Sequence, residues 1–132
     1  MNVKLLYAIL LFSVLSCKQS EIKSQSLEGK ILTSKTILFE QQIDGNMISR
    51  PVIIETSAEI NHLKSYPVVI ALHGRGGSNT NWVQPLSEFT NSGAFIGVYP
   101  QGHHNSWNLG QEPSNANDAV FISNIIDTLL SY

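Results

Sequence analysis

The sequence predicts an α/β fold in which a β-hairpin is followed by a β-α-β-α unit, and it predicts that this fold is incomplete. Two apolar runs, residues 67–72 and 94–99, flank a helical segment, which is the order of a parallel βαβ unit. A final amphipathic stretch, residues 118–130, has the pattern of a crossover helix, yet no strand follows it. Two strands of the doubly buried type cannot close a core in about 100 ordered residues, so we expect further strands in the whole domain.

The composition is that of an ordinary globular protein. The chain has 132 residues, 42% of them hydrophobic and 14% charged, with a formal net charge of −2. This weak negative charge and the lack of a clustered basic run give no reason to expect a nucleic acid as a partner.

The first residues have the pattern of an export signal. Lys4 precedes an apolar run over residues 5–15, which has about half the length of a membrane-spanning helix, so we expect a signal peptide over residues 1–16. The following Cys17 is the only cysteine, and residues 14–17 (VLSC) resemble the lipobox of bacterial lipoproteins. We therefore expect a lipid on Cys17 that anchors the exported chain to a bacterial membrane; the alternative is a plain secretory signal.

The next segment predicts a tether followed by a hairpin. Residues 17–35 are polar and poor in aromatics, which favours a flexible linker up to an ordered domain at 36–132. Residues 36–43 and 50–56 are strand candidates on either side of an Asp-Gly-Asn turn. Pro51 predicts that the second strand lies at an edge or that Pro51 is near its start.

The remaining elements follow from apolar periodicity. The continuous β-branched run at 67–72 predicts a strand buried on both faces. The elements after it are a glycine-rich loop, a helix at about 81–90, a buried strand at 94–99, a polar loop at 101–116 and a helix at 118–130 with Asn117 as its N-cap.

The glycine-rich loop His73–Gly77 is the most informative stretch. It follows the carboxyl end of a buried strand, where open α/β sheets place their ligands. Successive glycines let main-chain N–H groups approach a substrate and face a developing negative charge, but they are also common in plain strand-to-helix turns. From the residues alone, the two interpretations are about equally supported.

Other motifs match this region only in part. Residues 74–79 fit the first glycines of a dinucleotide fingerprint, but they end in Asn79 and no acidic residue closes the next strand, so we expect no nucleotide cofactor. Ser78 approaches the G-x-S-x-G elbow, but Thr80 replaces the last glycine and Ser78 is too far beyond the strand. We expect Ser78 to be an N-cap or a loop residue.

The two adjacent histidines do not predict a metal site. His103 and His104 lie in an extended loop, where neighbouring side chains diverge, and no carboxylate stands at ligand spacing. We expect no metal and assign these histidines to a loop or a substrate cleft.

Several segments, taken in order, resemble one family. They are residues 67–74 (PVVIALHG), Trp82, residues 95–102 (FIGVYPQG), residues 106–108 (SWN) and residues 117–122 (NDAVFI). The series is similar to the polyhydroxybutyrate depolymerase and feruloyl esterase group of secreted α/β-hydrolases, over about residues 60–131.

The resemblance implies a doubly wound sheet and a Ser-His-Asp triad that hydrolyses carboxylic esters, whether polymers or small esters, without a cofactor. It implies that the main-chain N–H of Arg75, or alternatively of Gly76, belongs to the oxyanion hole. His73, Gly74 and Gly77 would support this loop. The possible cleft residues are His103 and Trp107.

The resemblance also implies that the triad is missing from this chain. The elbow serine of the family lies on the strand after the last helix, and the acid and base lie further on, so we expect the chain alone to be inert. The missing strand would pair beside residues 67–72 and would leave an open apolar edge in its absence.

A second interpretation is a lipoprotein without enzymatic activity that binds polymer or carbohydrate. Trp82, Tyr99 and Trp107 would then supply stacking surfaces for sugar rings. We expect Trp82 and Tyr99 to be buried, which argues against this interpretation.

Overall fold

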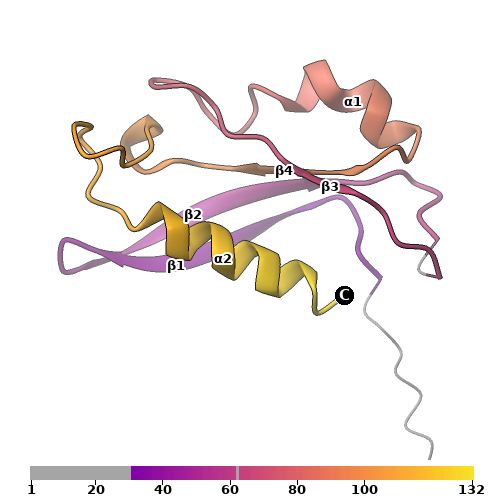
Figure 1. The fold of residues 1–132 in the computed structure, drawn as a ribbon, viewed down its shortest axis with the longest axis horizontal. Coiled ribbons are helices and arrows are strands. Elements are labelled where there is room, and N and C mark those ends of the chain that lie inside the picture. The colour runs from indigo at the N-terminus through magenta and orange to yellow at the C-terminus, as the bar shows by residue number, and fades with distance from the viewer. Residues whose placement is uncertain (1–30, 62) are drawn as a thin grey trace, which may run out of the picture.

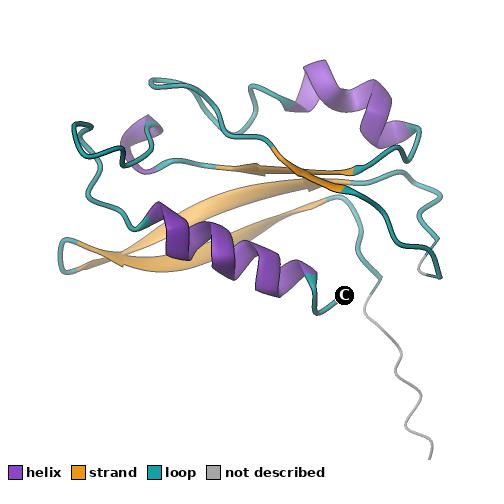
Figure 2. Cartoon of the chain, in the orientation of Figure 1, coloured by secondary structure: helices purple, strands orange, loops and turns teal. Residues whose placement is uncertain are grey.

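The computed structural model describes residues 31–61 and 63–132, and within them it is a mixed four-stranded sheet with two helices. The strand order is β1-β2-β4-β3. One helix lies on each face of the sheet (Figures 1 and 2). The α/β prediction is confirmed at this level. The expected signal peptide, Cys17 and the tether up to residue 30 lie outside the described residues.

The predicted hairpin is confirmed. β1 (Lys35–Ile43) and β2 (Asn46–Glu55) pair antiparallel along their whole length. The two residues between them have positive φ, 49° at Asp44 and 79° at Gly45, as in the two-residue turns that match the twist of paired strands. Asn46 already belongs to β2, so the turn is one residue shorter than predicted.

Pro51 lies in the middle of β2. The prediction that it marks an edge strand or the start of a strand was therefore wrong. β2 is an interior strand that pairs with β4 over Val52–Glu55. The Pro51 carbonyl accepts the N–H of Gln101 at 2.9 Å, so the side of Pro51 that lacks an N–H faces β4. The proline is tolerated because the β2–β4 ladder ends at this point.

The βαβ unit is confirmed, with one correction. β3 (Val68–Ile70) and β4 (Ile96–Pro100) are parallel, and α1 (Val83–Asn91) connects them. β4 is buried throughout, as predicted. β3 is shorter than predicted and is not buried on both faces, because it is an edge strand flanked by β4 alone; Val68 is 45% exposed.

The core lies between the sheet and α2 (Asp118–Leu129). Its buried members are Leu32, Val52, Ile54, Ile96, Val98, Phe121 and Ile125. The edge of the Phe121 ring meets Phe39 of β1 at a centroid distance of 5.9 Å. Leu32 is part of this core and β1 begins at Lys35, so these two residues of the segment predicted as a tether belong to the folded unit.

The start of α2 is fixed by its cap and by a buried ion pair. The Asn117 side chain accepts the N–H of Val120 at 3.1 Å, which confirms the predicted N-cap. One residue later, Asp118 Oδ1 lies 2.7 Å from Nη2 of Arg50, which is 1% exposed. Both atoms are buried, so this is an ion pair screened from water. Burial lowers the pKa of Arg50, and Asp118 opposes this shift.

Candidate functional site

Two loops meet at the carboxyl end of the parallel strands. Residues 73–79 leave β3 and residues 101–107 leave β4, and because these strands are parallel both loops emerge at the same end of the sheet (Figure 1). Open α/β sheets bind their ligands in this position.

His73 is buried and anchors the first loop. It is 2% exposed, and its Nδ1 lies 2.8 Å from the Gly74 carbonyl. Its Nε2 accepts the main-chain N–H of Gly102 at 3.0 Å, which assigns the proton to Nδ1. With both ring nitrogens engaged, His73 holds the two loops together and presents no free nitrogen to a substrate.

The glycines after His73 form a β-turn. The N–H of Gly77 donates to the Gly74 carbonyl at 3.0 Å, and Gly76 has a φ of 79°, the geometry of a type II turn with Arg75 and Gly76 at its centre. The Gly76 N–H donates to the Asn105 carbonyl at 2.7 Å and is therefore occupied. Within residues 31–61 and 63–132, the Arg75 N–H has no hydrogen-bond acceptor.

Close packing requires glycine at two points of these loops. A Cβ at Gly77 would lie 3.0 Å from the Gly74 carbonyl oxygen, and one at Gly102 would lie 2.3 Å from the Ser106 carbonyl oxygen. Both contacts lie within a single loop, so glycine at these positions allows each loop to fold tightly on itself.

Gln101 connects the two loops through its side-chain amide. Its Oε1 accepts the N–H of Asn79 at 2.9 Å. Its Nε2 lies 3.1 Å from the Gly102 carbonyl oxygen, 3.1 Å from Asn105 Oδ1 and 3.2 Å from His73 Nε2. An inverted amide would place its oxygen against these three acceptors, so this network fixes its orientation.

The predicted cleft residues are also engaged within the loops. Trp107 Nε1 donates to the His73 carbonyl at 2.8 Å, and the ring centroids of Trp107 and His73 are 5.2 Å apart. The ring centroids of His103 and His104 are 3.8 Å apart, and His103 Nδ1 lies 3.3 Å from Ser114 Oγ. Burial, with the nearby charges of His104 and Arg50, lowers the pKa of His103.

Ser78 is a loop residue, and the N-cap position of α1 is taken by Trp82. The Ser78 Oγ lies 2.7 Å from Thr80 Oγ1 and 3.0 Å from Asn81 Oδ1. Ser78 has no histidine partner among the described residues, so it lacks the base that would activate a nucleophile.

The three aromatic residues of the binding interpretation do not form a common surface. Tyr99 is fully buried, as predicted, and burial raises its pKa. Trp82 is 41% exposed, so the prediction that it is buried was wrong; its Nε1 instead reaches out of α1 to the Leu72 carbonyl at 3.0 Å.

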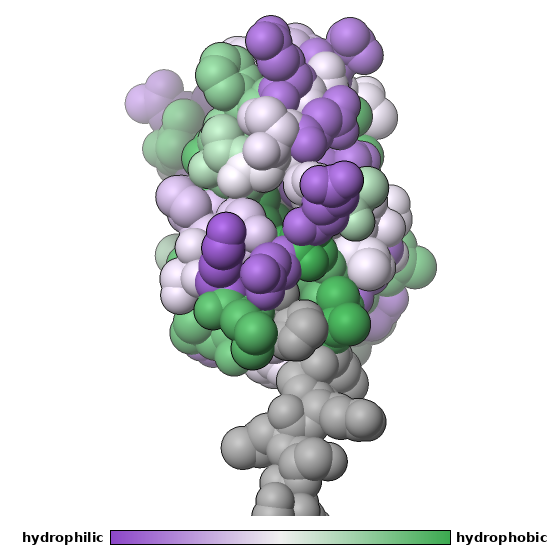
Figure 3. Space-filling view, turned by 90° about the vertical axis from the view of Figure 1, so that its right-hand side faces the viewer, coloured by the Kyte–Doolittle hydropathy of each residue, from purple (hydrophilic) through white to green (hydrophobic). Residues whose placement is uncertain are grey.

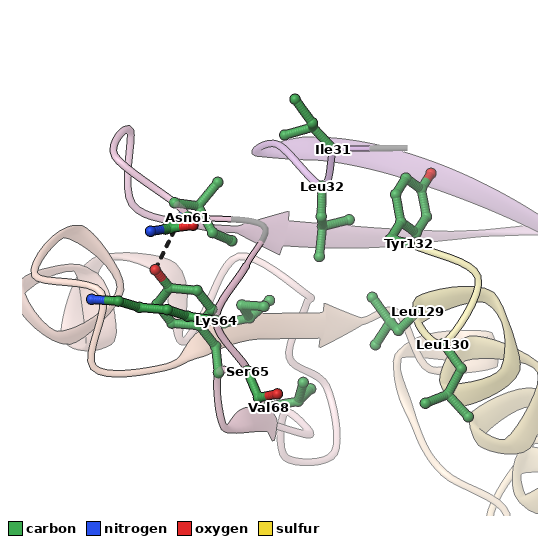
Figure 4. Close-up of a pocket in the computed structure, with 12 residues that line it drawn as sticks. Ile31, Leu32, Asn61, Lys64, Ser65, Val68, Leu129, Leu130 and Tyr132 are labelled. Carbon is green, nitrogen blue, oxygen red and sulfur yellow. Dashed lines mark hydrogen bonds between the residues drawn. The ribbon is translucent and has the colours of Figure 1, made fainter. Parts of the chain in front are cut away.

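The apolar hollows lie away from these loops. One, of about 340 Å³, is lined from separate segments by Leu32, Val68 and Leu129 at the opposite end of the strands (Figure 4). Apolar side chains also gather on the face of the molecule seen in Figure 3. A second hollow runs along the open edge of β3 beneath α2; its lining residues are Val68, Ile70, Ile126, Leu129 and Leu130.

Metal-ligand clusters and membrane-spanning helices are both absent from the described residues. In residues 31–61 and 63–132, no three His, Cys, Asp or Glu side chains are grouped as metal ligands would be. In the same ranges, no helix has the length and apolar character needed to cross a membrane.

Sequence reasoning missed the residues that join the two loops. Gln101 and Asn105 carry most of these contacts, but in the sequence they are two polar residues in a polar loop. A signal was present in the position of Gln101, which directly follows a buried strand on the side where ligands bind.

No protein-family model matches this chain, and no curated protein is significantly similar to it.

Proposed function

We propose that this chain is the N-terminal part of an exported serine hydrolase of carboxylic esters, similar to polyhydroxybutyrate depolymerases and feruloyl esterases. In this proposal the main-chain N–H of Arg75 binds the oxyanion. The signal segment exports the protein, and a lipid on Cys17 holds it at the membrane. The nucleophile, acid and base belong to a segment of the whole protein that follows Tyr132, so the chain alone is inert.

The turn at Gly74–Gly77 carries the proposal. At the second position of a type II turn the N–H points outward, and the Arg75 N–H is without an acceptor among the described residues. The turn is held by hydrogen bonds to the neighbouring loop, so its donor is oriented before a substrate arrives. A fixed main-chain donor at the carboxyl end of a parallel strand would be placed to stabilise the oxyanion of acyl transfer.

The open edge of β3 supports a continuation of the sheet. An apolar hollow separates this edge from α2, and a strand that followed α2 would fill it. That strand would bring its carboxyl end beside the Arg75 turn, where the family places its serine.

The structure does not favour the binding interpretation. Tyr99 is fully buried and Trp107 is half-buried, which leaves Trp82 as the one exposed aromatic residue among the three. A single exposed tryptophan does not make a sugar-binding platform.

The test uses a substitution that removes the Arg75 N–H hydrogen from the proposed oxyanion hole. Proline is favoured at the second position of a type II turn, so Arg75→Pro should keep the turn while deleting the N–H. In the whole protein we expect kcat on p-nitrophenyl esters to fall about 100- to 1000-fold. Arg75→Ala keeps the N–H and should lose far less activity, and Ser78→Ala should match the wild type.

A fluorophosphonate reagent provides the second measurement. It should label one serine beyond Tyr132 in the whole protein and none in the 132-residue chain. Labelling of Ser78, or a Ser78→Ala variant without activity, would show that the nucleophile is misassigned. Equal activity of Arg75→Pro and wild type would remove Arg75 from the oxyanion hole.

A further inference from the structure

We infer that Gln101 is a positioning residue for the proposed hydrolysis, and that its amide holds the Arg75 N–H in the orientation that binds the oxyanion. This inference rests on the proposed function for its catalytic consequence. The clamp itself is a property of the folded chain and can be measured without any ester.

The amide of Gln101 contacts residues on both sides of the Gly74–Gly77 turn. At the far end it receives the N–H of Asn79 at 2.9 Å, and at the near end it lies 3.2 Å from His73 Nε2. The Arg75–Gly76 turn lies between these two points. One side chain, from the residue that directly follows β4, therefore spans the loop that leaves β3.

Asn105 extends the clamp to the turn itself. Its Oδ1 lies 3.1 Å from Gln101 Nε2, and its main-chain carbonyl accepts the Gly76 N–H at 2.7 Å. Asn105 has a φ of 54°, a conformation that costs free energy for residues other than glycine. The contact with Gln101 helps to hold that conformation, and through it the peptide next to the Arg75 N–H.

The direction of the hydrogen bonds around the turn explains why the loss of Gln101 should affect catalysis more than it affects substrate binding. The Gly76 N–H is turned toward Asn105, and this fixes the peptide plane that follows Arg75. A loosened turn would still admit an ester, but its donor would no longer face the charge that develops on the carbonyl oxygen.

The test compares two glutamines. Gln101→Met keeps the side-chain length and removes all the amide contacts. Gln111→Met is the matched control, because Gln111 is exposed and its side chain makes no hydrogen bond within the described residues. In the whole protein, Gln101→Met should lower kcat about 10- to 100-fold with KM nearly unchanged, and Gln111→Met should match the wild type. Equal kcat values for the two variants would overturn the inference.

Amide hydrogen exchange in the full chain, followed by NMR, decides the clamp separately. Gln101→Met should speed the exchange of the Gly76 and Asn79 amides while the β2 amides stay protected. Unchanged exchange at both loop amides would overturn the inference. An inactive wild-type protein would refute the proposed function, and the exchange measurement would still decide the clamp.

A second variant covers the case in which Gln101→Met unfolds the chain. Asn105→Gly permits the positive φ and keeps the carbonyl that receives the Gly76 N–H, but it removes the acceptor for the Gln101 amide. In the whole protein it should also lower kcat, but by less than Gln101→Met does. Wild-type kcat in Asn105→Gly, together with protected loop amides, would again contradict the inference.

Discussion

Arg50 carries a positive charge into the interior, where its partners come from three other parts of the chain. Its Nε donates to the Gln101 carbonyl at 3.1 Å and its Nη1 to Gln41 Oε1 at 2.7 Å. Its guanidinium lies 3.7 Å from the ring centre of Phe121, and Asp118 provides the counter-charge. The residue thus joins β1, the loop after β4 and the first turn of α2.

Removal of the counter-charge should destabilise the fold strongly. Asp118→Ala leaves Arg50 buried without a carboxylate and leaves the Asn108 N–H without its acceptor, so we expect a loss of about 3 kcal/mol in the free energy of unfolding. Asp127→Ala, at an exposed position of the same helix, should change it by less than about 0.5 kcal/mol. Urea denaturation measures both values, and similar losses would show that the ion pair is unimportant.

Arg50 also shows what single-residue reasoning could not find. The sequence places it directly before Pro51 in a strand, and nothing local indicates that it is buried. Its partner Gln41 lies 9 positions away in the sequence, Gln101 lies 51 positions away, and Asp118 is more distant still. By contrast, the Asn117 cap was predicted, because its partner Val120 is three residues away.

At the scale of elements, the hairpin depends on the conformation of its turn. Asp44 and Gly45 both have positive φ, and neither β1 nor β2 could be in register with a turn of the opposite hand. This local rule is why the hairpin was predictable, including the identity of both strands.

Two glycine substitutions isolate the contribution of backbone conformation. Neither Gly45 nor Gly74 has an atom within 4 Å of an added Cβ, but only Gly45 has a positive φ. Gly45→Ala should therefore lower the free energy of unfolding by about 1 kcal/mol, and Gly74→Ala should leave it unchanged or raise it slightly. Thermal denaturation of the two variants measures this difference; equal melting temperatures would contradict the assigned turn.

The βαβ unit was predicted correctly, but the difference in burial between its two strands was not. Apolar runs at 67–72 and 94–99 are similar in the sequence, yet β4 is fully buried and β3 is a short edge strand. The difference comes from the strand order, which gives β4 two neighbours and β3 one. Order in a sheet is decided by contacts between distant segments, so an apolar run alone does not reveal it. The same limit applies to the candidate site: the loop after β3 was found from its glycines, and the loop that holds it was not.

At the scale of the molecule, the open edge of β3 should make the 132-residue chain self-associate. Val68 on this edge is 45% exposed, and unpaired apolar strands tend to pair with other chains. Val68→Lys should shift the chain toward monomer in sedimentation velocity. Val120→Lys is the control, because Val120 is 48% exposed on α2 and does not line the hollow at that edge.

Two results would contradict this prediction. The wild-type chain could sediment as a monomer at every concentration, or the two lysine variants could shift association equally. The second result would mean that general charge, rather than the β3 edge, controls association.

The positions of Ile31 and Tyr132 bear on how the proposed membrane anchor would orient the candidate site. Both residues line the hollow at the amino end of β3, and Lys35 near the start of β1 donates to the Tyr132 hydroxyl. The loop after His73 is at the other end of the same strands (Figure 1). Under the proposed function, an anchored chain would enter the folded unit at the end opposite the Arg75 turn, which would leave that turn open to an insoluble ester substrate.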